Sequence, residues 1–384
     1  MDLTERFLKY VSFPTASDEE SELTPSTPRQ LALAEYLADE LSGLGLEVKF
    51  DRASGCVYGY LPGTGGADGA IGFISHMDTS PSAPGENIKP RVIAYSGGDI
   101  ELGNGVVTSE KDFPNLNAYT GKHLIVTALE TLLQSPGIRR KNVAVAFTPD
   151  EEIGRGTDNF DLSAFRAKEA YTVDGGTLGE LEYECFNAAA ATLTVKGVNI
   201  HPGSAKNKMK NAALMAADFI SRMPAAQTPA HTEGYEGFYH LCEMKGDESN
   251  AALKWIVRDH DREKFERRKA FMQKLTDYMN EVYGGGFTLT LKDSYYNMRE
   301  LIEDGHMDLI ENAKAAFEKA GVTPKIVAIR GGTDGAMLTY KGLPCPNLSV
   351  GGENFHGVHE FACVEDMETM VRVIVRLASD DEEG

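Results

Sequence analysis

The chain has 384 residues, 42% of them hydrophobic and 25% charged, which is typical of a globular protein long enough for two domains. Its formal net charge of −20 argues against a nucleic acid or an anionic membrane surface as a partner. No apolar run approaches the roughly 20 residues of a membrane span, and the five cysteines are far apart, so we expect a cytoplasmic protein without a disulfide framework.

The first half of the chain alternates helical and strand patterns. Apolar residues at helical spacing predict helices over 3–11 and 28–43, the second with a proline near its start and a glycine at its end. Further runs predict strands over 45–50, 57–61, 70–75 and 143–147, and a helix over 128–134. This alternation indicates an α/β domain, a mixed sheet flanked by helices.

The pattern changes between residues 187 and 297, which we interpret as an inserted, two-layer α+β domain. Its βαββαβ-like order consists of strand 188–195, helix 211–223, strand 252–257, helix 261–282 and strand 286–292. From residue 298 the α/β pattern resumes, with helix 306–320, strand 325–329 and helix 364–378. Residues 1–186 and 298–384 would therefore form one domain, interrupted by the insertion.

Three consecutive acids, Asp150, Glu151 and Glu152, directly follow the apolar run 143–147. They would sit at the carboxyl end of a buried strand, where open α/β sheets bind ligands. Burying three neighbouring negative charges without compensation costs several kcal/mol or forces protonation, so the triplet indicates either a bound cation or a solvated acidic turn.

Other predicted strand ends also offer metal-ligand residues. His76 and Asp78 follow one strand, and period-2 alternation places them on the same side, where the carboxylate can orient the imidazole. Asp174 ends another strand before two glycines, and His356 or His359 lies in a glycine-flanked loop. Each alone is compatible with an ordinary turn, but a combined set of histidine and carboxylate without cysteine suits Zn²⁺, Mn²⁺ or Co²⁺ used in hydrolysis.

The chain resembles the M20 metallopeptidase family, and within it the aminopeptidases that act on tripeptides. The resemblance runs nearly end to end and rests on segments 75–80, 147–156, 171–186, 201–206, 233–240, 295–298, 330–335 and 352–361. It implies a zinc-dependent aminopeptidase that releases the N-terminal residue of tripeptides, and an inserted domain that closes over the substrate and forms a homodimer. A dipeptidase or N-acyl-amino-acid deacylase on the same scaffold is the alternative.

The resemblance also implies roles for individual residues. Two zinc ions per subunit would be bound by His76, Glu152, Asp174 and His356, while Glu151 acts as general base and Asp78 orients His76. In the inserted domain, His201 and Arg258 match positions that contact the peptide. Arg330, followed by two glycines, suits a peptide carboxylate because its guanidinium lies beside free backbone N–H groups; a tight turn with a salt bridge is the alternative.

One family segment is missing. The pattern Asp-Gly…Gly-Ala-Asp-Asp-Lys-Ala-Gly, whose first acid after Gly-Ala bridges the two metals, belongs after strand 124–127, but this strand runs directly into the predicted helix at Ala128. A strand-to-helix connection normally needs 2–6 residues, often turn-formers. Either roughly 20 residues of the protein are absent from the sequence between Thr127 and Ala128, or the deletion is real. A real deletion would leave one metal or none, and a catalytically inactive, peptide-binding protein becomes the third alternative.

Overall fold

The computed structural model describes residues 3–64, 69–83, 85–86, 88, 90–103, 105–123 and 140–380. The chain divides into two compact units, one of Met1–Tyr183, Glu300–Val327 and Thr333–Gly384, and one of Glu184–Arg299 and Ala328–Gly332. The sequence-based bounds of the insertion, 187–297, fall inside the longer segment of the second unit. No helix in the described ranges has the length and apolarity that a membrane crossing requires.

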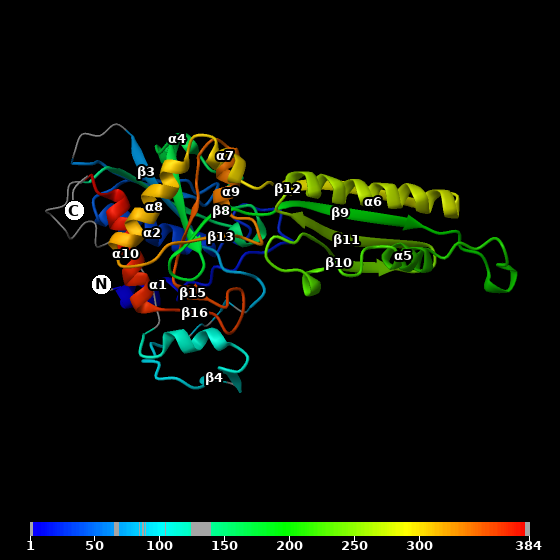
Figure 1. Ribbon diagram of the computed structural model, residues 1–384, viewed down its shortest axis with the longest axis horizontal. Helices are drawn as coiled ribbons and strands as arrows, with labels where there is room; N and C mark the ends of the chain where they lie inside the picture. The colour runs from blue at the N-terminus through cyan, green and yellow to red at the C-terminus, as the bar shows by residue number, and fades with distance from the viewer. Residues whose placement is uncertain are drawn as a thin grey trace. The chain divides into compact units, whose positions relative to one another are not determined.

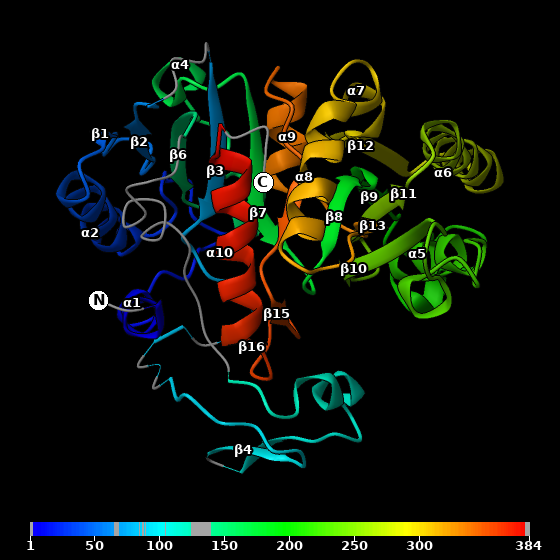
Figure 2. The ribbon, with the colours of Figure 1, turned by 60° about the vertical axis from the view of Figure 1, so that its left-hand side comes forward.

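The first unit is built on an eight-stranded mixed sheet of order β1-β2-β6-β3-β7-β14-β8-β13 (Figures 1 and 2). Its central strands β6, β3, β7 and β14 are parallel, whereas β1, β2 and β8 pair antiparallel with their neighbours. The strand bounds are β1 Glu47–Phe50, β2 Val57–Leu61, β3 Ala70–His76, β6 Asn142–Thr148, β7 Glu169–Gly175, β8 Glu180–Glu184, β13 Lys325–Ala328 and β14 Asn347–Ser349. The predicted α/β class with a mixed sheet is confirmed.

Helices of this unit cover the sheet with their apolar sides. α2 buries Leu33, Leu37 and Leu41 and packs against β1 and β2. Gly59 in β2 permits this contact, because a Cβ there would lie 3.0 Å from Leu41 Cδ1. α8 and α10 pack against each other, as both ribbon views show. The helix bounds are α1 Leu3–Tyr10, α2 Gln30–Gly43, α4 Leu162–Phe165, α7 Arg299–Glu303, α8 Met307–Lys319, α9 Asp334–Tyr340 and α10 Val364–Ala378, with the 3₁₀ turns η1 Pro114–Tyr119 and η2 Glu151–Ile153.

A small lobe of the first unit, residues 90–123, contains the antiparallel pair β4 (Ile100–Gly103) and β5 (Val106–Thr108) and the turn η1. Its own apolar cluster includes Tyr95, Leu116 and Tyr119 together with Cys363 from just before α10. A second antiparallel pair, β15 (Gly352–Glu353) and β16 (Phe361–Ala362), forms a hairpin before that helix. The lobe therefore packs on the segment that carries His356.

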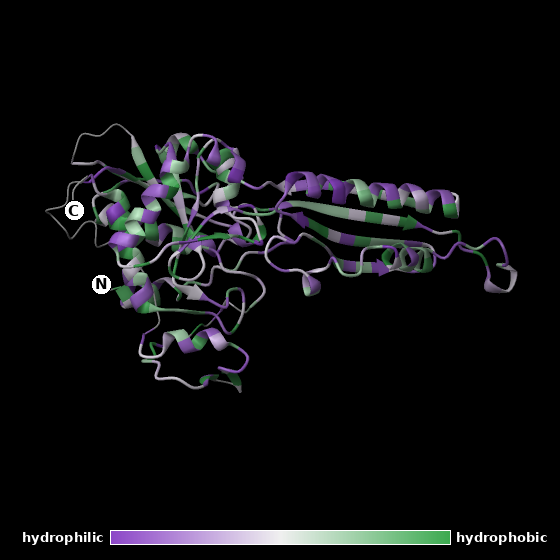
Figure 3. Cartoon of the chain, viewed as in Figure 1, coloured by the Kyte–Doolittle hydropathy of each residue, from purple (hydrophilic) through white to green (hydrophobic). Residues whose placement is uncertain are grey.

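The second unit is a four-stranded antiparallel sheet of order β10-β11-β9-β12 with α5 and α6 packed on it. Alternate residues of β9, from Ala189 to Val195, are buried among side chains of the two helices. Much of α6 is hydrophilic (Figure 3), as expected for a helix that buries one stripe, although Phe271, Tyr278 and Val282 on it are exposed. The bounds are β9 Asn187–Lys196, α5 Ala212–Ser221, β10 Phe238–Gly246, β11 Asn250–Asp259, α6 Arg262–Tyr283 and β12 Phe287–Tyr295, with η3 Pro202–Ser204 and η4 Pro229–His231.

The second unit has the order βαββαβ, and the five elements predicted for it are all present, with β10 as an additional strand between α5 and β11. Its edge strand β10 was not predicted, because its apolar residues, Phe238, Tyr239, Leu241, Cys242 and Met244, do not alternate regularly with polar ones. The predicted strand 124–127, the predicted helix 128–134 and the junction between Thr127 and Ala128 lie outside the described residues.

Candidate metal and catalytic site

Three parallel strands bring their carboxyl ends together at one edge of the main sheet. His76 is the last residue of β3 and pairs in register with Thr148, the last residue of β6. On the other side β3 pairs with β7, which ends with Asp174 and Gly175. The residues that follow β6, Glu151 and Glu152, therefore lie close to His76 and Asp174, as the carboxyl ends of parallel strands predict.

The carboxylate of Asp78 joins the histidine to the acidic turn. It lies 3.3 Å from His76 Nδ1, and it accepts hydrogen bonds from the backbone N–H groups of Glu151 at 3.0 Å and of Glu152 at 3.2 Å. Asp78 is only 3% exposed, and these three contacts supply the hydrogen-bond partners that a buried carboxylate needs. They fix both the imidazole ring and the start of the turn η2.

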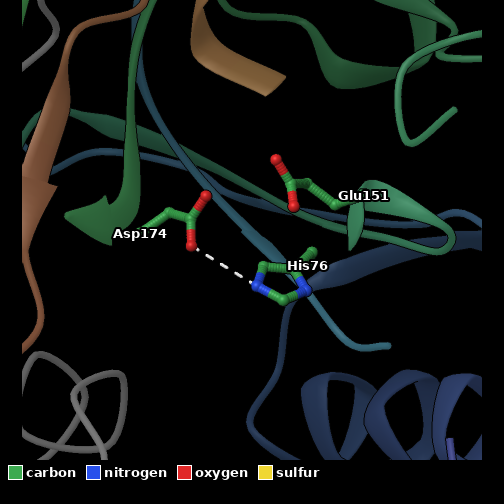
Figure 4. A group of neighbouring side chains, drawn as sticks. All are labelled: His76, Glu151 and Asp174. Carbon is green, nitrogen blue, oxygen red and sulfur yellow. Dashed lines mark ion pairs between the residues drawn. The ribbon is translucent and has the colours of Figure 1, made fainter. Parts of the chain in front are cut away.

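His76, Glu151 and Asp174 form a compact group of donors (Figure 4). His76 Nε2 lies 3.3 Å from Asp174 Oδ1, and one ligand atom of each of the three residues lies within 4.8 Å of the others. Burial disfavours the imidazolium, but the carboxylates of Asp174 and Asp78 outweigh it and raise the pKa of His76 well above its usual value. Burial and the nearby charge of Asp174 raise the pKa of Glu151 well above that of a free glutamate.

Glu152 and His356 form a second pair, with His356 Nε2 3.0 Å from Glu152 Oε2. His356 lies in the loop between β15 and β16 with a positive φ of 63°, and its backbone N–H donates to Glu360 at 3.1 Å. The hydrogen bond that His356 Nε2 donates to the Glu152 carboxylate raises the pKa of His356. Glu152 is 10% exposed in its side chain, whereas the ring of His356 is 62% exposed.

Glu353 anchors the hairpin that carries His356. Its carboxylate accepts hydrogen bonds from Tyr119 at 2.7 Å, from Thr177 at 2.8 Å and from Asn115 at 3.0 Å. Thr177 follows closely on Asp174 along the chain, so this contact connects the hairpin to the end of β7. Tyr119 and Asn115 connect it to the lobe 90–123.

Asp334 is a buried acid next to the site that sequence reasoning did not single out. It is 5% exposed, accepts a hydrogen bond from Thr148 at 2.8 Å, and burial raises its pKa to about 7. A Cβ on Gly156 would lie 2.4 Å from its Oδ1, so this glycine makes room for the carboxylate. Asp334 belongs to the segment 330–335, which carries part of the family resemblance, but the sequence analysis assigned a role only to Arg330 in it.

Asp150, the first acid of the triplet, uses its carboxylate to brace the turn. It accepts hydrogen bonds from Ser26 N at 2.7 Å and Gln30 Nε2 at 2.8 Å, and it is 1% exposed. Its backbone is in the left-handed region, with φ of 56°. The triplet thus has one structural acid and two acids directed at the site.

The three predicted substrate-binding residues lie in the second unit. His201 is exposed and its Nδ1 accepts the backbone N–H of Gly203 at 3.2 Å. Arg258 donates to the carbonyl oxygen of Arg330 at 3.1 Å, and its Nε is buried with no hydrogen-bond partner among the described residues. Their contact with a peptide stays a prediction.

Arg330 uses its guanidinium on its own chain. Nη1 donates to the carbonyl oxygens of Gly234 and Glu236, and Nη2 donates to the carbonyl and hydroxyl oxygens of Thr232. A bidentate contact between Arg330 and a peptide carboxylate would use the same two atoms, Nη1 and Nη2. The predicted carboxylate-binding role of Arg330 therefore stays a prediction that would require these bonds to break.

The spacing of the donor pairs tests whether the site fits a metal. Two donors about 2.0–2.2 Å from one tetrahedral ion lie roughly 3.3–3.6 Å apart. The 3.3 Å between His76 and Asp174 meets this spacing, and Glu151 lies beside them. Within the described ranges, no other group of three or more histidine, cysteine or carboxylate side chains has its ligand atoms within 4.8 Å of one another. The residues therefore fit one divalent ion at His76 and Asp174.

A bridged pair of ions needs one more acid. Two dications about 3.5–4 Å apart repel each other by on the order of 15–20 kcal/mol at an effective dielectric constant of about 20, unless an anion lies between them. Among the described residues, no carboxylate joins the pair of Glu152 and His356 to that of His76 and Asp174 in one group of donors. The described site does not fit a dinuclear centre.

Comparison with known proteins gives three findings. Residues 183–286 match the family model of the peptidase dimerisation domain. The chain is 47% identical to peptidase T of Halothermothrix orenii, over 98% of both chains. Its fold is similar to those of a tripeptidase from Staphylococcus aureus (TM-score 0.76, 20% identity, 97% of this chain and 96% of that one) and of a dinuclear metal-binding M20 peptidase from Bacillus subtilis (TM-score 0.63, 13% identity, 97% and 95%).

The length of the alignment bears on the missing segment. The match to the Halothermothrix protein spans 404 positions, whereas 98% of this 384-residue chain is about 376 residues, so about 28 positions have no counterpart here. This total is large enough to include the roughly 20 residues expected for the missing metal-bridging segment. Its location after Thr127 stays a sequence-based prediction.

Proposed function

Because the chain belongs to the peptidase T family of M20 peptidases, we propose that it is a metal-dependent aminopeptidase that releases the N-terminal residue from tripeptides. The observation that carries the proposal is the group of His76, Asp174 and Glu151, with two donors at ligand spacing and a carboxylate beside them. This is the arrangement that metal-assisted hydrolysis requires: a metal ion and an adjacent base.

The metal is proposed to be zinc, because two carboxylates and an imidazole without cysteine suit a borderline-soft divalent ion. When bound, such an ion polarises a peptide carbonyl and lowers the pKa of a coordinated water. His76 and Asp174 would hold it. Asp78 would keep the Nδ1 proton of His76 in place, leaving Nε2 free to bind the metal.

Glu151 is proposed as the general base. Its carboxylate lies within 4.8 Å of the donor atoms of His76 and Asp174, and burial and the charge of Asp174 raise its pKa, which makes it a stronger proton acceptor. It would take the proton from the attacking water and pass it to the amine of the leaving dipeptide. Its backbone N–H, held by Asp78, fixes the carboxylate relative to His76.

The inserted unit is proposed to form a homodimer, in line with its match to the peptidase dimerisation domain. A cytoplasmic location is proposed from the absence of cysteine pairs in the sequence and from the family. His201, Arg258 and Arg330 are proposed to bind the peptide.

The experiment compares substrates and metals. The purified chain is stripped with a chelator, reloaded with Zn²⁺, Mn²⁺ or Co²⁺, and assayed on tripeptides, dipeptides, N-acetylated tripeptides and N-acyl amino acids. We expect hydrolysis of tripeptides with a free amino group, and loss of 10²-fold or more in kcat for Glu151→Gln. Glu300→Gln, an exposed acid of the same unit, is the control.

Two outcomes would contradict the proposal. A preference for dipeptides or N-acyl amino acids would favour the alternative activity on this scaffold. Binding of tripeptides without hydrolysis under any of the three metals would favour a catalytically inactive peptide-binding protein, the outcome that loss of the bridging acid would produce.

A further inference from the structure

The two pairs of predicted ligands differ in how well the protein holds them. His76 is fixed by Asp78 on one ring nitrogen and faces Asp174 with the other, and both side chains of that pair are 21% exposed. His356 is 62% exposed, lies in a hairpin loop, and its ring pairs with Glu152. A ligand whose ring is already oriented loses less freedom when the metal binds, so the first pair is the stronger site.

The two pairs also differ in the donors near them. Glu151 lies within 4.8 Å of both donors of the first pair, so a metal there can keep a water between itself and a carboxylate. Among the described residues, no third histidine, cysteine or carboxylate completes the pair of Glu152 and His356. Catalytic zinc sites usually have three protein ligands, so the pair with a third carboxylate within reach, His76 and Asp174 beside Glu151, is the better site.

The sequence explains why the second pair is incomplete. The acid that would be shared between two ions belongs to a segment missing after Thr127, and the alignment with a relative leaves about 28 positions without a counterpart. In residues 124–139, which lie outside the described ranges, the sequence has one acid, Glu130.

We propose that this chain binds one divalent metal ion, at His76 and Asp174, and that Glu152 and His356 remain an ion pair instead of a second metal site. The inference rests on the proposed metal dependence. It separates this chain from dinuclear relatives while leaving the proposed base, Glu151, at the bound ion.

The test is the metal stoichiometry of the full chain. Metal-free protein is titrated with Zn²⁺ in a calorimeter, and the bound zinc is measured by mass spectrometry after gel filtration. We expect one ion per chain for the wild type and for His356→Ala, and none retained for His76→Ala. His240→Ala, which removes an exposed histidine of the second unit, controls for zinc bound nonspecifically at the surface.

Two ions per chain in the wild type, or one ion that is lost in His356→Ala and kept in His76→Ala, would overturn the inference. If the wild type binds two ions, the Glu130→Gln variant tests whether Glu130 is the acid shared between them. In that case the variant would bind one ion. The proposed function fails separately, because a chain that holds one ion but does not cleave tripeptides contradicts the activity and leaves the stoichiometry standing.

Discussion

Replacing Asp78 by asparagine tests the role of the acid that joins His76 to the acidic turn. Three donors share its two oxygens: Oδ1 faces Glu151 N–H at 3.0 Å and His76 Nδ1 at 3.3 Å, and Oδ2 accepts Glu152 N–H at 3.2 Å. The asparagine amide is best accommodated with its NH₂ at the Oδ2 position, where it meets one donor instead of two. The N–H of Glu152 then loses its acceptor inside the protein.

The magnitude follows from this geometry. One buried donor left unsatisfied costs about 1–3 kcal/mol. Part of this cost is offset, because removing the charge of Asp78 relieves its repulsion with Glu151 and Asp334. We therefore expect Asp78→Asn to lower the free energy of unfolding of the metal-free protein by about 1–2 kcal/mol in urea titrations.

The Asp78→Asn change should lower the affinity for metal more than it lowers the stability of the fold. Loss of the carboxylate that orients a ligating histidine typically weakens metal binding by about 10- to 100-fold. The assay is competition for Zn²⁺ with a fluorescent chelator, and Asp39→Asn, an exposed change on α2, is the control. An unchanged zinc affinity in folded Asp78→Asn protein would refute the idea that Asp78 positions His76 for a metal.

Three further changes test other parts of the site. Gly156→Ala should destabilise the fold by about 1–3 kcal/mol in urea titrations, because its Cβ would lie 2.4–2.5 Å from the carboxylate oxygens of Asp334, whereas Gly43→Ala, with no atom within 4 Å, should be neutral or slightly stabilising. Burial raises the pKa of Glu182 to about 8, so the folded state holds a proton that the unfolded state releases near pH 4.5, and stability should fall by up to about 1.4 kcal/mol per pH unit from pH 4.5 to 8. The free energy of unfolding should fall less with pH in Glu182→Gln. Equal slopes of this free energy against pH in the wild type and the variant would contradict the role of Glu182. Glu353→Gln should speed hydrogen exchange in the hairpin that carries it several-fold and leave exchange in α2 unchanged, because Gln cannot accept all three hydrogen bonds as strongly as a carboxylate.

Local patterns were enough to predict some of the site. Period-2 alternation placed Asp78 beside His76, and the apolar run before Asp150 placed the acids at a strand end. The pairing of Glu152 with His356 depends on a hairpin far along the chain, so spacing alone does not predict it. The burial of Asp334 depends on the absence of a side chain at Gly156, a tertiary contact that no local pattern records.

The second unit also has a consequence for the order of biosynthesis. Its strands and helices are complete once the ribosome has made residue 295, but the loop 232–236 receives hydrogen bonds from Arg330, which is made later. A nascent chain that ends before Arg330 therefore leaves the three carbonyl groups of this loop without these donors. The central insertion is thus completed only after part of the surrounding unit has been translated.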